Sequence, residues 1–308
     1  MTSSQTGGSV NTHQHNPELE GMLPIGFEPL GRQGKVRNIY ESTDGQSICL
    51  IASDRVSAFD QVSPTPIPGK GELLNKIAAQ ELCAAEAAQI STWFDIIYSE
   101  NPRASIGTKA EVQPVEMIFR NYMTGSMWRE YKETGDFTGL GLPKGLSEWA
   151  DFTSEPLFTP STKSDKDVNF NAGNVEEVTG IDAETFDRMH RICRKLFELG
   201  TARANSKGLI LVDTKYEIGK NSNGDYIIID EVHTPDSSRF VLKDDFKELI
   251  EAGEKPISLS KEFLRGVMLG RAGGDVDIAK QLMAEPLAQS VVDEVAEKYN
   301  NLYQIFKD

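Results

Sequence analysis

One predicted strand carries a charged side chain at every second position, and no other feature restricts the fold of this chain so strongly. The three residues are Asp213, Lys215 and Glu217. Because neighbouring side chains of a strand point to opposite faces, all three project from the same side. The Asn223-Gly224 pair then favours a tight hairpin turn, and the return strand brings Asp230 and Glu231 back beside them.

The carboxylates of this hairpin, gathered around one lysine, would destabilise a buried core unless cations compensated for them. Mg²⁺ bound to nucleotide phosphates gives that compensation, because it takes one or two carboxylates together with phosphate oxygens and water. The hairpin therefore predicts a magnesium-nucleotide site. The alternative is a hairpin whose polar face is simply solvated.

Two arginine-bearing segments predict a second site, for an anion. Arg239 ends the segment Asp236-Ser237-Ser238-Arg239, which continues from the hairpin. Arg120 follows the apolar run 112–119, and Thr124-Gly125-Ser126 mark the start of a helix just after it. An arginine fork beside free N-terminal amides is a good receptor for carboxylate or phosphate. A solvated arginine at the end of a strand is the alternative for Arg120.

The glycine-rich segment from Gly31 to Arg37 combines a pliable backbone with positive charge. Glycines let backbone N–H groups approach phosphate oxygens, and Lys35 and Arg37 add the opposite charge. The spacing is not that of a Walker P-loop and is closer to the glycine-rich lid of kinase-like nucleotide sites. An exposed turn is the alternative.

A further polar segment, Ser53 to Asp60, stands at the end of a predicted strand and leads into the Pro/Gly-rich loop 64–71, with Lys70 near its tip. Rigid polar loops at strand ends suit substrate contacts. Asp60 and Lys70 are therefore predicted to bind substrate, and a turn with capping residues is the alternative.

The remaining pattern predicts a mixed fold. We expect a hairpin between Val36 and Ile51, a helix over 73–90, strands over 93–98 and 112–119, an irregular stretch over 134–174, a helix that ends near Gly208, a strand over 209–212, a hairpin over 216–229, and several helices from Phe246 onward with breaks near 253–256, 272–275 and Pro286. The apolar stripe of the helix before Gly208 is interpreted as core and not as a cofactor site.

The composition excludes several classes of function. A net charge of −15 disfavours a protein that coats nucleic acid, although a cleft can still concentrate cations for small anions. No apolar run reaches the roughly 20 residues of a membrane-spanning helix. Residues 1–20 are polar, carry no secretory signal and predict a disordered tail. Three cysteines that match no zinc or redox spacing indicate a reduced, cytoplasmic location.

Taken in chain order, the polar segments resemble the SAICAR synthetase family. The matching segments are Gly34–Arg37, Ser53–Asp60, Pro66–Gly71, Arg120–Ser126, Leu157–Lys163, Asp213–Glu217 and Asp230–Arg239. The last two are the most specific, and around them the chain reads DTKYEIG and DEVHTPDSSR. The resemblance runs from about Gly31 to Arg239 and continues weakly to the end.

The resemblance implies an α+β fold of the ATP-grasp-like or SAICAR synthetase-like kind, with the active site between two lobes. By this resemblance we expect a β-rich nucleotide-binding lobe over 21–120, after the tail over 1–20. A larger α/β lobe over 121–308 would carry the metal and ribotide sites.

The resemblance also implies an ATP-dependent ligase of purine biosynthesis. Such an enzyme joins L-aspartate to carboxyaminoimidazole ribotide through an acyl phosphate, with ATP and Mg²⁺, and needs no nucleic acid, membrane or obligate protein partner. One alternative is a small-molecule kinase that uses the same lid and metal acids. The other is an ATP-binding regulatory module without turnover, against which the second anion site at Arg120, Ser126 and Arg239 argues.

By the same resemblance, individual residues take defined roles. The ATP-binding residues would be Gly34, Lys35, Arg37, Glu116 and Lys163, with Glu116 at the border of the adenine pocket. The Mg²⁺ ligands would be Glu217 and Asp230. The ribotide phosphate and carboxylate would be held by Arg120, Ser126, Asp213, Lys215 and Arg239, of which Asp213, Lys215 and Arg239 would also be catalytic.

One loop departs from the family pattern. After Thr162-Lys163 the chain reads Ser164 to Asn169, which is shorter than usual and lacks the histidine of a His-Asp pair. The resemblance therefore extends to Lys163 and only loosely to Asp167. It leaves open which residues hold aspartate, and the sequence does not define an oligomeric state.

Overall fold

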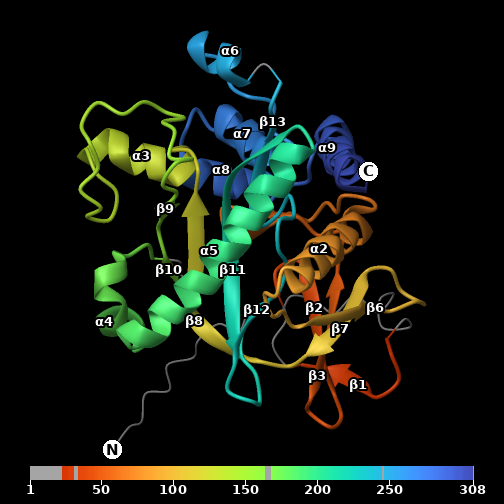
Figure 1. The fold of residues 1–308 in the computed structure, drawn as a ribbon. Coiled ribbons are helices and arrows are strands. Elements are labelled where there is room, and N and C mark those ends of the chain that lie inside the picture. The colour runs from red at the N-terminus through yellow and green to blue at the C-terminus, as the bar shows by residue number, and fades with distance from the viewer. Residues whose placement is uncertain (1–22, 31–33, 164–167, 245, 308) are drawn as a thin grey trace, which may run out of the picture.

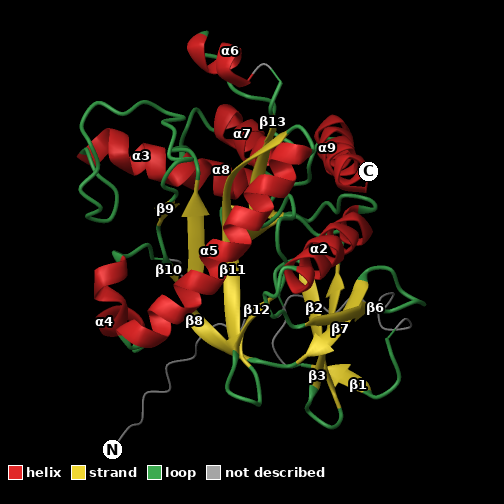
Figure 2. Ribbon diagram, in the orientation of Figure 1, coloured by secondary structure: helices red, strands yellow, loops and turns green. Residues whose placement is uncertain are grey.

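We describe a computed structural model over residues 23–30, 34–163, 168–244 and 246–307. Two main antiparallel sheets and the helices around them confirm the predicted α+β class (Figure 1 and Figure 2). The expected tail over residues 1–20 lies outside the described residues. Among the helices described, none has the length and apolar character needed to cross a membrane.

The smaller sheet is built from the N-terminal part of the chain and lies at the lower right of Figure 1. Its strands, in sheet order, are β1 (Phe27–Pro29), β2 (Arg37–Ser42), β3 (Ser47–Ala52), β7 (Ala104–Thr108) and β6 (Phe94–Ile97). The hairpin of β2 and β3 confirms the prediction. Strand β7 was not predicted, because its sequence Ala-Ser-Ile-Gly-Thr contains a single large apolar side chain and hence no alternation.

Helix α2 (Lys70–Ala87) packs against this sheet and confirms the helix predicted from the Ala- and Leu-rich segment. Its apolar residues Ile77, Leu82 and Ala85 are buried in the main core. Before it, β4 (Ser57–Ala58) and β5 (Gln61–Val62) form a separate two-stranded ribbon.

The larger sheet has β11 (Leu209–Lys220) at its centre, and this is one continuous strand where the sequence predicted two. On one side it pairs with β8 (Glu111–Arg120), and on the other with β12 (Tyr226–Ile229) and β13 (Ser238–Leu242). The short strands β9 (Leu157–Phe158) and β10 (Ser161–Thr162) pair with β8.

Strand β8 lies at the place where the sequence predicted the boundary between the lobes. The sequence interpretation placed residues 21–120 in the β-rich N-terminal lobe, whereas β8 pairs along most of its length with β11. Its residues Val115, Met117 and Phe119 are buried in the core of the larger sheet. Strand β8 therefore belongs to the larger sheet and not to the smaller one.

Helix α5 (Ala183–Ser206) packs across β8 and β11 (Figure 1). Its start is fixed by Asp182, whose side chain accepts a hydrogen bond from the backbone N–H of Thr185. The predicted apolar stripe is buried against the sheet and consists of Phe186, Met189, Cys193, Leu196 and Phe197. Its interpretation as core is confirmed.

The remaining described helices include η1 and α4, which were not predicted, and the C-terminal helices, which follow the predicted breaks. They are α3 (Gly125–Thr134), η1 (Ala172–Asn174), α4 (Val175–Thr179), α6 (Phe246–Glu251), α7 (Glu262–Arg271), α8 (Val276–Met283) and α9 (Gln289–Lys307). Helix α9 returns to pack against α2 and α7, so the C-terminal segment touches the element that covers the smaller sheet. Residues 134–174 are mostly irregular, as predicted, within the part of that stretch that the structure describes.

Candidate active site

The register between β8 and β11 builds one charged face. Glu217 lies directly opposite Glu116, and Asp213 lies directly opposite Arg120. Residues at alternate positions of paired strands share a face, so Lys215 stands between these two cross-strand pairs. The predicted alternation along β11 is thus matched by a second row of side chains on β8.

Lys215 is the centre of the acidic end of this face. Its Nζ lies 2.5 Å from Glu116 Oε1 and 3.9 Å from Glu217 Oε1. Burial lowers the pKa of Lys215, but the carboxylates of Glu116, Glu217 and Asp230 outweigh it and raise the pKa above its ordinary value. Lys215 therefore stays protonated, as a fixed positive charge among acids.

Lys163 and Arg37 bring further positive charge to these acids. Lys163 forms an ion pair with Glu217. Arg37 donates to Asp230 at 2.5 Å and forms an ion pair with Glu231. Burial lowers the pKa of Arg37, but both carboxylates counteract this and raise it overall. The structure thus gathers predicted residues from β2, the loop after β10, β11 and the loop after β12.

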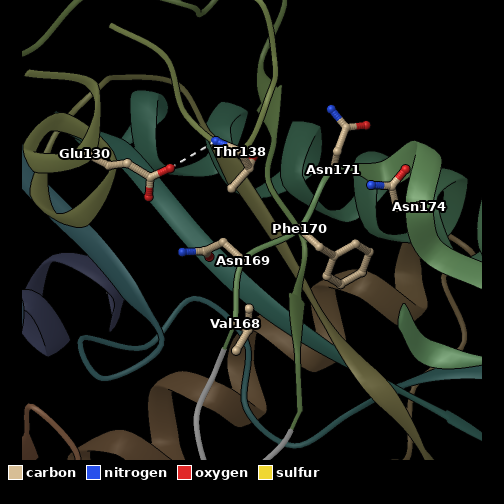
Figure 3. A pocket seen from close by; sticks show the side chains of 7 residues that line it. All are labelled: Glu130, Thr138, Val168, Asn169, Phe170, Asn171 and Asn174. Carbon is tan, nitrogen blue, oxygen red and sulfur yellow. Dashed lines mark hydrogen bonds between the residues drawn. The ribbon is translucent and has the colours of Figure 1, made fainter. Parts of the chain in front are cut away.

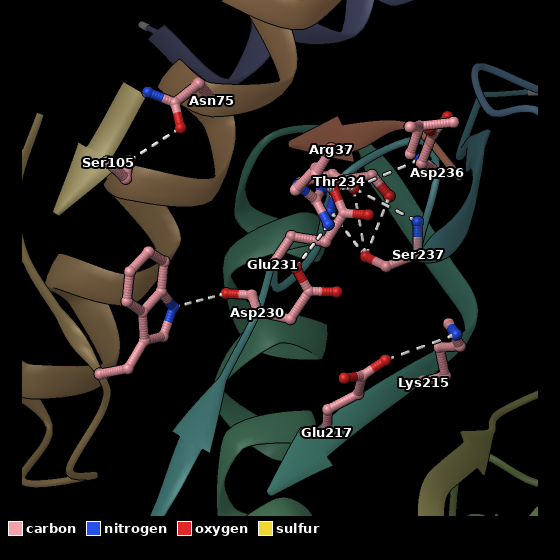
Figure 4. A network of polar contacts seen from close by, with 12 residues as sticks. Arg37, Asn75, Ser105, Lys215, Glu217, Asp230, Glu231, Thr234, Asp236 and Ser237 are labelled. Atoms are coloured by element: carbon pink, nitrogen blue, oxygen red, sulfur yellow. Dashed lines mark hydrogen bonds and ion pairs between the residues drawn. The ribbon is translucent and has the colours of Figure 1, made fainter. Parts of the chain in front are cut away.

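The loop that follows β12 carries Asp230 and Glu231 to this place (Figure 4). Asp230 has a left-handed backbone (φ 61°), and its carbonyl oxygen accepts a hydrogen bond of 2.8 Å from Trp93 Nε1. Thr234 donates to Glu231 at 2.6 Å. Burial raises the pKa of Glu231, and the charge of Arg37 opposes that rise.

The arginine end of the same face lies around Asp213. Arg120 Nη1 donates to Asp213 Oδ2 at 2.8 Å, and Arg239 pairs with the same oxygen. Arg239 also donates to Glu262 at 3.0 Å, and Arg265 donates to Glu262 at 3.3 Å. Three guanidinium groups thus share two carboxylates, and the surplus of positive charge suits an anion.

Gly125 explains how Arg239 can lie against the start of α3. A Cβ at this position would stand 2.4 Å from Arg239 Nη2, and the backbone has a positive φ of 64°. Only glycine accepts both conditions. Ser126, the next residue, is exposed in the first turn of α3.

Arg265 and Glu262 were missed by sequence reasoning, and both come from α7. The sequence predicted helices in this part of the chain but assigned no role to their charged residues. No local signal distinguishes these two residues, because their partner Arg239 lies on another element and reaches them only in the folded chain.

In the segment predicted to form the lid, Lys35 forms an ion pair of 2.6 Å with Asp60, and both side chains are about half exposed. Burial raises the pKa of Asp60, but the hydrogen bond and charge of Lys35 lower it overall. Gly34 donates its N–H to the carbonyl of Arg37 at 3.0 Å. The structure therefore places Gly34, Lys35 and Asp60 together, while residues 31–33 of the predicted lid lie outside the described residues.

Lys70 corrects the prediction that it binds substrate. The side chain is fully buried, and its Nζ lies 2.8 Å from Asp236 Oδ2. Asp236 also accepts a hydrogen bond from Tyr299 of α9. Burial raises the pKa of Asp236, but the charges of Lys70 and Lys261 lower it overall. Lys70 is the first residue of α2 and does not lie at the tip of an exposed loop. Its charge neutralises that of the buried Asp236.

The predicted metal ligands Glu217 and Asp230 both carry carboxylate oxygens, the type of donor that Mg²⁺ prefers. Their side chains are 13% and 29% exposed, so both are near the surface of the acidic end. In the part of the chain that the structure describes, no three acidic, histidine or cysteine side chains gather into a full metal cage. Mg²⁺ takes one or two carboxylates and completes its shell with phosphate oxygens and water.

A hollow of about 560 Å³ lies between the start of α4 and the loop before it (Figure 3). It is lined by Glu130, Thr138, Val168, Asn169, Phe170, Asn171 and Asn174. Glu130 accepts a hydrogen bond of 3.1 Å from the backbone of Thr138. None of the predicted site residues lines it, so the charged face of β8 and β11, and not this hollow, defines the candidate site.

Comparison with known proteins gives consistent matches. The model of the SAICAR synthetase family matches residues 30–282. A phosphoribosylaminoimidazole-succinocarboxamide synthase of Bacteroides thetaiotaomicron is 39% identical over 275 residues, which cover 87% of this chain and 85% of that protein. The protein of the same name from Cytophaga hutchinsonii is 39% identical over 287 residues, covering 88% and 86%.

Solved structures agree with these matches. A SAICAR synthase from Saccharomyces cerevisiae, in complex with SAICAR, superposes with a TM-score of 0.76 and 32% identity, covering 94% of this chain and 96% of that one. A SAICAR synthetase in complex with ADP superposes with a TM-score of 0.64 and 25% identity, covering 89% and 96%.

Proposed function

This chain belongs to the SAICAR synthetase family and is an ATP-dependent ligase of purine biosynthesis, and from that premise we propose how its residues divide the work. The reaction joins L-aspartate to carboxyaminoimidazole ribotide and yields SAICAR, ADP and phosphate. A carboxylate is a poor electrophile, so one end of the site must handle phosphates and the other must hold the ribotide.

The continuous charged face of β11 is the observation that carries the proposal. Glu217, Lys215 and Asp213 stand in a row, with acids around the first two and arginines around the third. A strand rises about 3.3 Å per residue, so the row spans roughly 13 Å. That length suits a nucleotide phosphate at one end and an anionic second substrate at the other.

At the acidic end, Glu217 and Asp230 would hold Mg²⁺, which would neutralise charge on the ATP phosphates. Lys35, Arg37 and Lys163 would contact the nucleotide, with Gly34 allowing close approach of the backbone and Glu116 near the adenine side. The ADP complex of a family member supports the use of a nucleotide. The ion pairs of Arg37 and Lys163 with these acids support their place beside the phosphates.

At the arginine end, Arg120, Arg239 and Ser126 would bind the ribotide phosphate and carboxylate. Asp213 pairs with both arginines and fixes the direction of their forks. Asp60, which is paired with Lys35, would also contact the substrates.

In the first step, an oxygen of the ribotide carboxylate would attack the γ-phosphorus of ATP, with ADP as the leaving group and an acyl phosphate as the product. Lys215 would neutralise charge between the two substrates. In the second step, the amine of aspartate would attack the acyl carbon, lose a proton and expel phosphate. Such transfer depends mainly on alignment and charge neutralisation, which a site of lysines and arginines provides without a nucleophilic side chain.

A small-molecule kinase is the alternative that the family relationship does not favour. The cytoplasmic location remains part of this proposal, supported by three cysteines that form no disulfide.

Lys215→Met tests the proposed site. With ATP, Mg²⁺, aspartate and ribotide, we expect SAICAR formation, followed by mass, to fall by about 100-fold or more, because a fixed charge in the transfer site is lost. Lys220→Met removes an exposed lysine from the end of the same strand and is the control, with activity expected within twofold. Equal activity of both variants would show that Lys215 is outside the site.

A further inference from the structure

The loop between β12 and β13 has a backbone conformation that needs external support. Asp230 and His233 both lie in the left-handed region, with φ of 61° and 54°. Residues other than glycine pay for this conformation and keep it only where the surroundings hold it. Because the loop carries Asp230 and Glu231 into the acidic end, what holds it also sets the position of these acids.

His233 ties the middle of the loop to the core through both ring nitrogens. Its Nδ1 lies 2.9 Å from Glu81 Oε2 on α2, and its Nε2 lies 2.6 Å from the hydroxyl of Tyr216 on β11. All three side chains are at most 1% exposed. Arg203 of α5 also pairs with Glu81 at 2.8 Å and balances its charge.

In one tautomer of His233, each of these groups has a hydrogen-bond partner. A neutral imidazole donates from Nδ1 to the carboxylate of Glu81 and accepts at Nε2 from the hydroxyl of Tyr216. The chain of groups from Arg203 to Tyr216 is then fully hydrogen-bonded. A buried network in which every member has a partner is rigid.

Gly200 shows that α5 is shaped around this ring. A Cβ at position 200 would lie 2.3 Å from His233 Cε1 and Nε2. Any side chain there would push the ring out of its place. The seat of His233 is therefore closed on one side by α5 and on the other by α2 and β11.

The bond between Tyr216 and His233 joins the two elements that carry the acidic end. Tyr216 stands between Lys215 and Glu217 in β11, and its side chain points to the opposite, buried face. His233 follows Asp230 and Glu231 in the loop. No side chain of this pair reaches the charged face, yet the pair fixes the strand and the loop relative to each other.

We propose that His233 is a positioning residue for the ligase reaction. Through Tyr216 and Glu81 it holds Asp230 and Glu231 at a fixed place relative to Lys215 and Glu217. The proposal rests on the proposed function only in taking these residues as the transfer site. Because a displacement of about 1 Å can cost up to about 100-fold in rate, loss of the bond should act on turnover.

Two single variants break the same hydrogen bond from opposite sides. Tyr216→Phe keeps the ring and removes the hydroxyl. His233→Asn keeps a donor near the place of Nδ1 and tolerates the left-handed backbone, but has no group at the place of Nε2. We expect each to lower kcat about tenfold and to change KM for ATP and ribotide less than about twofold. The double variant should also lose about tenfold and not a hundredfold, because both changes remove one interaction.

Tyr131→Phe is the matched control. Its hydroxyl donates to the carbonyl of Pro143 at 2.6 Å, and the residue belongs to a different hydrophobic cluster, which contains Met123 and Phe137. It should lower the melting temperature about as much as Tyr216→Phe and leave kcat within twofold. This comparison separates positioning from a general loss of stability.

The proposal is overturned if Tyr216→Phe lowers the melting temperature but keeps kcat within twofold of the unmodified protein. The same holds if the double variant shows the product of the two single losses. Should His233→Asn not fold, the comparison of Tyr216→Phe with Tyr131→Phe decides alone. If Lys215→Met and Asp230→Asn also leave kcat unchanged, the proposed site itself is wrong; if they lower it, only the positioning role fails.

Discussion

Among the strand residues themselves, the two ends of the charged face on β11 pair similar carboxylates with different cations. At the acidic end, Glu116 and Glu217 meet the point charge of Lys215. At the arginine end, Asp213 meets the planar forks of Arg120 and Arg239. Lysine neutralises charge without dictating direction, whereas the guanidinium fork matches the geometry of a carboxylate or phosphate.

This difference in cations shows how one strand can bind two ligands of different charge. Around Lys215 the acids prevail, so this end has room for an additional cation. Around Asp213 the arginines prevail, so that end has room for an anion. The comparison predicts that substitutions at the two ends alter different kinetic constants, and the experiments below are ordered by the size of the expected effect.

Asp230→Asn should have the largest effect. Losing a carboxylate at the acidic end should lower kcat by about 100- to 1,000-fold and raise the Mg²⁺ concentration needed for half-maximal rate. Asp225→Asn, in the exposed turn of the same hairpin, is the control. Titration of activity with Mg²⁺ is the measurement, and near-normal turnover of Asp230→Asn at saturating Mg²⁺ would remove the metal assignment.

Arg239→Ala should mainly raise the KM for ribotide. A hydrogen bond to a charged group contributes about 1.5–3 kcal/mol, which corresponds to roughly 10- to 100-fold in binding. The KM for ATP should stay within about twofold, because we propose that the nucleotide binds at the other end. Arg271→Ala is the control, because Arg271 is an exposed residue at the end of α7. An unchanged KM for ribotide would place the second substrate elsewhere and end the division into two sites.

The sequence was sufficient for the row on β11 because alternation along a strand is a local property. The positions of Asp213, Lys215 and Glu217 determine their common face before any partner strand is known. The hairpin that returns Asp230 follows from Asn223-Gly224 for the same reason. The structure confirms both elements, with β11 and β12 joined at the predicted turn.

The register of β8, the pairing of Lys70 and the contribution of α7 depend on contacts between distant residues. Glu116 meets Glu217 only because β8 lies beside β11, and Lys70 meets Asp236 across most of the chain. Strand β13 was missed because its neighbours are Ser, Pro and Asp, which signal a turn. Local patterns therefore predicted the β11 face and could not predict these distant partners.

The pH dependence of stability in Glu262→Gln tests the charge balance of the arginine end. Burial raises the pKa of Glu262, but Arg239 and Arg265 outweigh this and lower it from the ordinary 4.5 to about 2. A carboxylate with a lowered pKa stabilises the fold above pH 4.5, and this contribution is lost as the pH falls from about 4.5 to about 2. We expect Glu262→Gln to be less stable by about 1–2 kcal/mol at neutral pH.

Melting temperatures measured from pH 7 to pH 2 give the check. The curves of the unmodified protein and of Glu262→Gln should converge as the pH approaches 2, because the carboxylate is already protonated in the unfolded chain and becomes protonated in the folded chain as well. Glu285→Gln, at an exposed position, should follow the unmodified protein throughout. A constant offset between the curves down to pH 2 would show that the charge of Glu262 is not what stabilises this end.

Tyr299→Phe should have the smallest effect, and it should alter the binding properties of the acidic end and of the arginine end at the same time. Tyr299 of α9 donates to Asp236, which lies between Glu231 at the acidic end and Arg239 at the arginine end. Removing this hydroxyl should lower the free energy of unfolding by about 1 kcal/mol, because Asp236 keeps its ion pair with Lys70. Since the loop is shared, the Mg²⁺ requirement and the KM for ribotide should shift in the same variant, each by about twofold. Tyr303→Phe on the same helix is the control, and a shift confined to one end would show that the two ends do not share this support.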